Sequence, residues 1–283
     1  MGGRQSKQPG EAPAGARRWE ARVRALGDRR VRQTDGACFV EGIRAVCEAL
    51  DAGLPFEAVL LCGERLRSTV ALAAIARLRA AGVPCVDLPP SRFARLSDMD
   101  NPVGLAAIVR WAPGELADLA PPAPEDLYVV AEDLGDPGNL GTLLRTADGA
   151  GVAAVVVAGG GTDAGHRRCL RSSLGTAFRL PLVRADEPGE AIAWAGAAGV
   201  VTIGTSAHAA PSVWEAEVPE HTALAVVVGN EERGLRQETA AACDIAVRIP
   251  MLGSATSLNV AVATGIVLYE LRRRRPPAAG RRP

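Results

Sequence analysis

From residue 127 onward, short apolar segments alternate with segments of helical periodicity, and this alternation limits the possible folds more than any other feature. The apolar runs span 127–134, 153–159, 200–206, 224–231 and 246–251, and helical patterns at 139–150, 187–198, 233–242 and 257–271 separate them. Continuous apolar strands that alternate with helices predict a parallel sheet covered on both faces. In such sheets a ligand binds beyond the carboxyl ends of the strands.

Composition shifts predict the domain boundaries. Residues 21–111 carry a shorter α–β alternation, which predicts a smaller α/β domain. Four prolines within 112–126 predict a linker, and the larger domain follows at 127–275. Residues 1–20 are expected to form a disordered basic tail and residues 276–283 an Arg/Pro tail.

Charge is unevenly distributed although the net charge is zero. Residues 1–34 hold nine basic residues against three acids, and residues 271–283 hold six arginines and no acid. Basic ends on a neutral body fit a polyanion such as RNA. An arginine-rich composition with a single lysine would produce the same excess without a polyanion partner.

The remaining composition excludes several classes of protein. The six cysteines form no C-x-x-C pair, and the three histidines lie far apart, so we expect reduced thiols and no metal site. The N-terminus lacks the apolar segment of a secretory signal, and the terminal helix is too short to span a bilayer. We therefore expect a cytoplasmic protein without membrane contact.

The first strand-end motif is NLGTLLRTADGAG at 139–151. Asn139 is expected to cap a helix whose apolar face is formed by Leu140, Leu143, Leu144 and Ala147. Arg145 points away from that face. It is either a solvated helix arginine or a fork for a phosphate or oxyanion above the sheet.

The second motif is VVVGNEERGL at 226–235, where a strand runs into Gly229, Asn230 and Glu231. The glycine either lets a ligand approach the backbone or simply forms a capped turn. The turn matches neither a P-loop nor a dinucleotide-binding fingerprint, which disfavours a metabolic nucleotide-binding enzyme.

The third motif is IPMLGSATSLNVAVATGIVLYE at 249–270, within a terminal stretch that extends to Leu271. Its helix is apolar almost all round, which predicts a buried helix. The polar residues Ser254, Thr256, Ser257 and Asn259 at its start are either caps of a core helix or part of a ligand site.

These three motifs, in this order, resemble the SpoU (TrmH-type) family of RNA ribose 2′-O-methyltransferases, within the SPOUT superfamily. The segment LRSSLGTAFRLPLV at 170–183 also resembles the family's linking stretch, and residues 37–110 resemble a ribosomal-protein-like RNA-binding domain. The resemblance implies a SPOUT-type α/β knot, in which a parallel sheet carries a C-terminal trefoil knot behind the smaller N-terminal α/β domain. It also implies S-adenosylmethionine as cofactor and a homodimer.

The resemblance further implies the residues of the site. The cofactor is expected at Thr205, Gly229, Asn230, Ile249, Met251, Ser257 and Leu258. The catalytic positions are expected at Asn139, Arg145, Glu231, Ser257 and Asn259. Because a guanidinium keeps its proton beyond pH 12, we expect Arg145 to stabilise the developing 2′-oxyanion, with Glu231 and Ser257 orienting Arg145 or the nucleotide.

Three questions stay open at this stage. The substrate is expected to be 23S rRNA, with transfer RNA as the alternative, and the target nucleotide is not specified by the sequence. The modification serves either housekeeping or self-protection against an antibiotic. A non-catalytic RNA-binding protein of the same fold is a further alternative.

Overall fold

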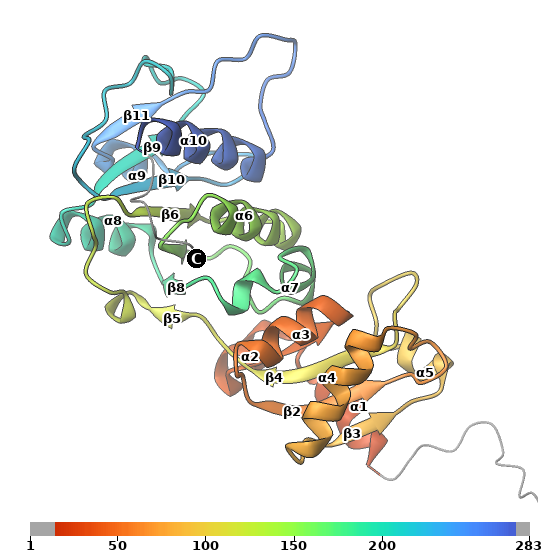
Figure 1. Ribbon diagram of the computed structural model, residues 1–283. Helices are drawn as coiled ribbons and strands as arrows, with labels where there is room; N and C mark the ends of the chain where they lie inside the picture. The colour runs from red at the N-terminus through yellow and green to blue at the C-terminus, as the bar shows by residue number, and fades with distance from the viewer. Residues whose placement is uncertain (1–14, 276–283) are drawn as a thin grey trace, which may run out of the picture. The chain divides into compact units, whose positions relative to one another are not determined.

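The computed structural model describes residues 15–275 and divides into two compact units between Ala112 and Pro113 (Figure 1). This break lies beside residue 111, where the sequence places the end of the first domain. The remaining residues of the two expected tails, 1–14 and 276–283, lie outside the described part of the chain.

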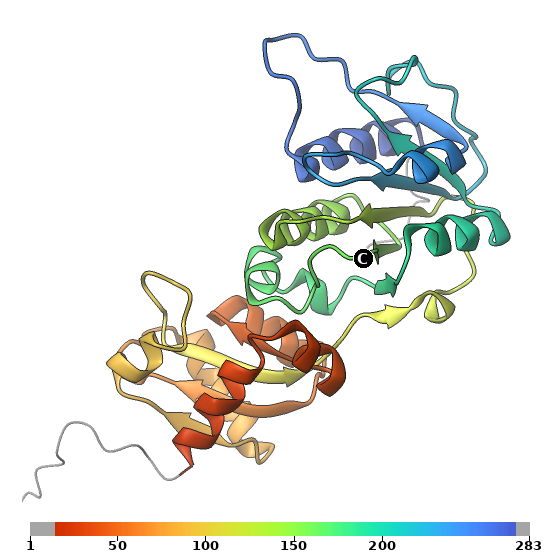
Figure 2. The same ribbon diagram turned by 180° about the vertical axis from the view of Figure 1, so that it is seen from behind.

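The first unit is a four-stranded sheet with helices on both faces. The strands follow the order β1 (Ala37–Glu41), β4 (Leu105–Arg110), β2 (Phe56–Leu61) and β3 (Cys85–Asp87). Its helices are α1 (Ala16–Ala25), α2 (Arg29–Asp35), α3 (Ile43–Asp51), α4 (Thr69–Ala80) and α5 (Pro90–Ala94). Only β3 pairs in parallel, with β2. Helix α1 crosses one face, where Phe39, Leu60 and Ile108 are buried beneath it (Figure 2).

Helix α1 shows that the expected disordered tail is too long. The helix starts at Ala16, so residues 16–20 of the expected tail are helical. Ala16 and Val23 are buried in the core of the unit, and Glu20 pairs with Arg92 at 2.7 Å. Tertiary packing therefore orders residues whose composition alone resembles that of a flexible tail.

The second unit contains a seven-stranded sheet in which every strand pair is parallel. The strands follow the order β11 (Ile245–Val247), β9 (Val201–Thr205), β10 (Leu224–Val228), β6 (Leu127–Glu132), β7 (Ala154–Ala158), β8 (Leu182–Ala185) and β5 (Gly114–Glu115). Its helices are α6 (Pro137–Gly149), α7 (Arg167–Ser172), α8 (Pro188–Ala197), α9 (Gln237–Ala242) and α10 (Val260–Arg274), with the short 3-10 turns η1 (Leu116–Asp118) and η2 (Thr176–Phe178). The predicted parallel α/β sheet is confirmed.

The proline-rich segment 112–126 is not simply a linker. It forms the edge strand β5, which pairs with β8, followed by η1. The carboxylate of Asp118 accepts a hydrogen bond from the Glu115 amide at 2.8 Å. The edge of a sheet tolerates prolines in the adjoining chain because one side of the strand needs no partner, so the segment joins the second unit.

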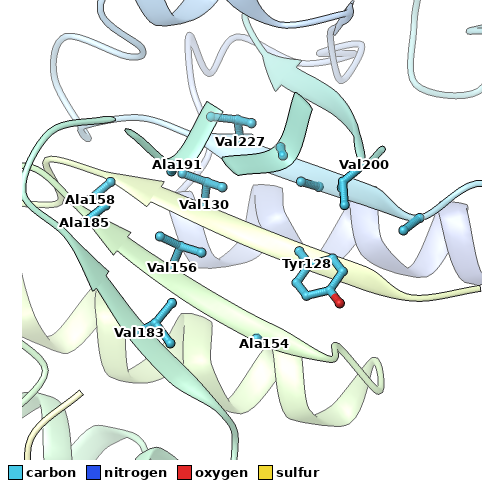
Figure 3. Close-up of a cluster of buried hydrophobic side chains, with 13 residues drawn as sticks. Tyr128, Val130, Ala154, Val156, Ala158, Val183, Ala185, Ala191, Val200 and Val227 are labelled. Atoms are coloured by element: carbon cyan, nitrogen blue, oxygen red, sulfur yellow. The ribbon is translucent and has the colours of Figure 1, made fainter. Parts of the chain in front are cut away.

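Both faces of this sheet are covered, as the apolar strands require. One face packs against α8 through alternating strand residues, among them Val130, Val156 and Val227, with α6 and α10 behind the strands (Figure 3). On the α6 side Leu140, Leu143 and Leu144 are fully buried, so the predicted apolar face of this helix is confirmed. Each such leucine contributes about 1.5–3 kcal/mol by leaving water.

Helix α10 differs from its prediction in two respects. It begins at Val260, three residues later than expected, because the Asn259 side chain accepts hydrogen bonds from the amides of Ala261 and Val262. It is also not buried all round, since Val262 is 51% exposed and Tyr269 is 57% exposed. An apolar sequence therefore gave a helix with one uncovered face.

The arginines at the end of α10 serve the fold. Arg272 donates to the carbonyls of Ala150 at 2.8 Å and Glu125 at 3.1 Å. Arg274 donates to the carbonyls of Val213 and Ala216, and Arg275 to those of Glu220 and Thr222. These arginines donate hydrogen bonds to backbone carbonyls of loops that are distant in sequence. Their positive charges therefore serve the fold and are not evidence for a polyanion partner.

Within residues 15–275, no three His, Cys, Asp or Glu side chains gather as a metal ion would require. In the same range no helix is long and apolar enough to cross a membrane. The six cysteines, all within this range, form no disulfide bond, and burial raises the pKa of the Cys169 thiol far above its usual range.

Replacing Arg272 with Met should lower the free energy of unfolding by about 1–3 kcal/mol, because two or more loop carbonyls lose their donor. Arg184→Met is the matched control, since Arg184 is 45% exposed and pairs with a single exposed carboxylate, Asp186. Chemical denaturation measures both. Equal stability of the two variants would contradict the structural role of Arg272.

Candidate functional site

The candidate site lies at the carboxyl edge of the parallel sheet. Helix α6 starts after β6, and α10 starts beyond the loop that follows β11, so both helices begin at this edge. The two helices run side by side in the same direction (Figure 1). Tyr269 donates a hydrogen bond to the Gly149 carbonyl at 3.1 Å, and a Cβ at Gly265 would lie 3.0 Å from Thr146. Because the two helices pack closely and run in the same direction, their starts also lie together.

A chain of side-chain hydrogen bonds joins the three motifs at this point. The Asn259 amide donates to the Asn139 side-chain oxygen at 2.8 Å. The Asn139 amide in turn donates to the Glu231 carboxylate at 2.9 Å. Residues separated by 92 and 120 positions in the sequence thus form one cluster. Three of the five expected catalytic residues are brought together.

Backbone amides complete the binding of the Glu231 carboxylate. Gly135 donates to one oxygen at 2.9 Å, and Asp136 donates to the other at 3.2 Å. Partial burial alone would raise the pKa of Glu231, but the hydrogen bonds from Asn139, Gly135 and Asp136 outweigh it and hold the pKa below its usual range. Glu231 is therefore ionised at neutral pH and holds the turn before α6.

Asn139 is not the helix cap that the sequence predicted. Helix α6 begins two residues earlier, at Pro137, and Asp136 caps it by accepting from the Asn139 backbone amide at 2.9 Å. An Asp followed by Pro is an ordinary helix-start signal, so the sequence contained this information. Because Asp136 does the capping, the Asn139 side chain is available to bind Glu231 and Asn259.

The second motif forms a closed turn around Asn230. Its side chain donates to the Asp133 carbonyl at 2.9 Å and accepts from the amides of Glu232 and Arg233. Its backbone exchanges both hydrogen bonds with Gly234. Asn230 therefore has a structural role in this turn, and its hydrogen-bonding groups are already used within the chain.

Gly229 is required by the same turn. A Cβ at this position would lie 2.2–2.3 Å from the backbone atoms of Gly234 and Leu235. The close approach that the sequence suggested is therefore made by the chain's own backbone. This distance excludes any larger residue irrespective of a ligand.

The other expected cofactor residues follow neighbouring strands. Thr205 ends β9, and its hydroxyl donates to the Val227 carbonyl at 3.1 Å. Ile249 and Met251 lie beyond the end of β11, not within a strand as predicted. Ser257 and Leu258 precede α10. Strands β11, β9 and β10 are adjacent, so these loops all leave the sheet at its carboxyl edge.

The loop 249–258 stands out from the sheet (Figures 1 and 2). Leu252 is 97% exposed, and the side chains of Ser254, Thr256 and Ser257 are also exposed. Within residues 15–275 these three hydroxyls have no hydrogen-bond partner. Ser257 is therefore not brought to the Asn139–Glu231–Asn259 cluster.

Arg145 also lies outside the hydrogen-bonded cluster. It is exposed on α6, opposite the leucine face as predicted, and has no ion pair within the described range. No bond joins Glu231 to Arg145 among the described residues, and the carboxylate accepts from Asn139, Gly135 and Asp136. Arg145 thus presents a free guanidinium to solvent.

A hollow of about 440 Å³ adjoins the cluster. It is lined by Gly135, Asp136, Asn139, Asn230, Glu231, Glu232 and Arg233. A neighbouring hollow of about 530 Å³ shares Gly135, Asn230 and Arg233 with it. The sequence reasoning missed Gly135, Asp136 and Arg233. For Arg233, the one signal in the sequence was its position close to Glu231 in the second motif.

Comparison with known proteins identifies the family of each unit. Residues 126–269 match the model of the SpoU rRNA Methylase family, and residues 21–107 match the MRM3-like substrate binding domain. A 23S rRNA (uridine(2479)-2′-O)-methyltransferase of Streptomyces viridochromogenes is 33% identical over 263 residues, covering 91% of this chain and 88% of that protein. The 23S rRNA (guanosine-2′-O-)-methyltransferase RlmB of Vibrio vulnificus is 31% identical and covers 84% of this chain and 97% of that protein.

Solved structures give the same result. The SpoU methyltransferase AviRb of Streptomyces viridochromogenes, in complex with the cofactor AdoMet, has a TM-score of 0.81 at 31% identity, covering 93% of this chain and 99% of that one. An AdoMet-bound rRNA methyltransferase of Sinorhizobium meliloti has a TM-score of 0.80 at 30% identity, covering 90% and 94%. With its parallel sheet, its three joined motifs and these similarities, the chain belongs to the SpoU rRNA methylase family.

Proposed function

We propose that this protein methylates a ribose 2′-hydroxyl in 23S rRNA, with S-adenosylmethionine as methyl donor. The observation that carries the proposal is the hydrogen-bond chain Asn259–Asn139–Glu231, which assembles three motifs at the carboxyl edge of the parallel sheet. Ligands of such sheets bind at this edge. The relatives named as 23S rRNA 2′-O-methyltransferases support the reaction and the substrate class.

The residues at the edge of the sheet fit the cofactor. S-adenosylmethionine supplies a methyl group on a positively charged sulfur. Neighbouring loops after β9, β10 and β11 would hold it, through Thr205, the turn at Gly229 and the backbone of Ile249, Met251 and Leu258. The exposed polar groups of the loop 249–258 support this assignment, because they have no partners within the described chain. Asn230 supports the pocket through the shape of its turn.

Methyl transfer requires the chain to position the 2′-oxygen and to assist the loss of its proton. The new carbon–oxygen bond forms as the carbon–sulfur bond breaks, and the hydroxyl proton leaves the oxygen. Arg145 cannot accept that proton, because its guanidinium stays protonated. In our proposal it stabilises the developing 2′-oxyanion, while the Asn139–Glu231–Asn259 cluster holds the surrounding backbone rigid and Ser257 contacts the nucleotide from its loop.

We further propose a homodimer that uses the exposed face of α6 and α10. Val262 and Tyr269 are large hydrophobic side chains that are exposed on α10. Thr142 and Arg145 are exposed on the adjacent helix α6. Pairing of two such faces would bury the apolar side chains and would place Arg145 at the interface. In this proposal the chain after β10 also forms a trefoil knot, which the similarity to the SpoU family supports. The protein acts in the cytoplasm, where ribosomal RNA is its substrate.

Purified protein and S-adenosylmethionine should add one 2′-O-methyl group at a defined ribose of 23S rRNA taken from cells that lack the gene. Arg145→Ala should slow single-turnover transfer by about 10²-fold or more without changing cofactor affinity, because only transition-state stabilisation is lost. Ribose-methylation mapping and calorimetry measure the two effects. Binding of RNA without methylation would favour the non-catalytic alternative, and methylation of transfer RNA alone would refute the assigned substrate.

Val262→Arg should shift the protein from dimer to monomer, because a charge would be buried within the proposed interface. Leu72→Arg is a matched control, since Leu72 is 53% exposed, close to the 51% of Val262, but lies on α4 in the first unit. Sedimentation velocity measures the mass of each variant. A wild-type monomer, or a Val262→Arg variant that stays dimeric, would refute the interface.

A further inference from the structure

Carboxylates surround the Asn139–Glu231 cluster and would repel the phosphates of an RNA substrate. Asp136, Glu231 and Glu232 all line the adjoining hollow, and Glu231 is held in its ionised form. Each phosphate of the RNA brings another negative charge to this carboxylate-lined surface. A nucleotide can dock here only if cations offset both sets of charges.

Arg168 is the first cation available at this rim. Its guanidinium pairs with Asp136 at 3.0 Å, and its side chain is 54% exposed. Asp136 is the one ion-pair partner of the Arg168 guanidinium within residues 15–275. A guanidinium has five N–H donors, so one carboxylate leaves donors for a phosphate oxygen. Arg168 therefore resembles a phosphate-binding fork that is already anchored on one side.

The position of Arg168 is fixed by packing as well as by charge. Helix α7, which carries it, packs against α6, where Gly141 allows Ser172 and Cys169 to approach (Figure 1). A Cβ at Gly138 would lie 3.1 Å from Nε and 3.2 Å from Nη2 of Arg168. The guanidinium thus lies directly against the first turn of α6, adjacent to Asn139. A group held in this way loses little entropy on binding a ligand.

Arg233 is the second cation. It lines both hollows and is exposed in the turn that follows Glu231. Its backbone amide donates to the Asn230 side chain at 3.2 Å, which fixes the start of its side chain. Its guanidinium has no ion-pair partner among the described residues, whereas Arg236 nearby is committed to Asp133 and Glu187. Arg233 can therefore reach a ligand in the hollow.

We propose that Arg168 and Arg233 bind the RNA phosphates that flank the target ribose. This inference rests on the proposed function and assigns the contacts that place the nucleotide at the Asn139–Glu231 cluster. Arg145 then acts at the reacting oxygen, and Arg168 and Arg233 act as positioning residues at the backbone of the RNA. The guanidinium of Arg168 also offsets the charge of Asp136, and the charge of Arg233 helps to lower the pKa of Asp133.

The chain offers a matched control for Arg168. Arg179 pairs with Asp148 at 2.7 Å and is 40% exposed, so it also couples one arginine to one aspartate of α6. Asp148 lies at the end of α6, whereas Asp136 caps its start. Arg179 thus forms a comparable arginine–aspartate pair at the end of the helix away from the site, with a further bond to the Thr176 hydroxyl. It should not contact the RNA at the target nucleotide.

The test compares Arg168→Gln, Arg233→Gln, Arg168→Lys and Arg179→Gln, with unmodified 23S rRNA as ligand and single-turnover methylation as second readout. Arg168→Gln and Arg233→Gln should each weaken RNA binding about tenfold and reduce the slope of log affinity against log salt by about one, because one phosphate contact is lost. Affinity for S-adenosylmethionine should stay unchanged. Arg168→Lys should keep the salt slope but recover only part of the methylation rate, since a point charge cannot reproduce the fork.

The possible outcomes separate the two proposals. If the wild type neither binds nor methylates the RNA, the proposed function fails. If the wild type is active and the salt slopes of Arg168→Gln and Arg233→Gln match that of Arg179→Gln, only the phosphate assignment fails. A lower melting temperature of Arg168→Gln with an unchanged salt slope would likewise overturn it, because Arg168 would then serve only to neutralise Asp136.

Discussion

The bonds between Asn259, Asn139 and Glu231 are the constraint on which the site depends. Each residue belongs to a different motif, and Glu231 and Asn259 also satisfy backbone amides at the starts of the two helices. Glu231 binds the amides before α6, and Asn259 caps α10. A single polar cluster therefore fixes two helix starts and one strand-end turn relative to one another. Because polar networks lose much of their value when one member is missing, the three motifs are coupled physically.

Arginine has several distinct roles in this chain, and its position in the fold separates them. Arg272 and Arg275 are enclosed by loop carbonyls and stabilise the fold. Arg168 and Arg233 are exposed beside carboxylates at the site, and Arg145 has no partner within the described residues. Exposed guanidinium groups at a sheet edge can bind an anion, whereas those already bound to carbonyls cannot. Total basic charge is therefore a poor guide to the RNA-binding surface.

The sequence allowed prediction of the parallel sheet and of the leucine face of α6, because both follow from local periodicity. It also placed Asn139, Glu231 and Asn259 in one site through the family resemblance. It left open whether Gly229 and Asn230 serve a ligand or their own turn, since only a folded backbone reveals the contact with Gly234. The exposed face of α10 was missed for a related reason. Apolar composition does not distinguish a helix buried in one chain from a helix with an uncovered surface.

A double-mutant cycle on Asn139 and Asn259 tests the central account most directly. The rate of single-turnover methyl transfer is measured for the wild type, Asn139→Ala, Asn259→Ala and the double variant. If one hydrogen-bonded cluster assembles the site, the double variant should be little slower than the slower single variant, with a coupling energy of about 0.5–3 kcal/mol. Independent effects that multiply in the double variant would contradict the account.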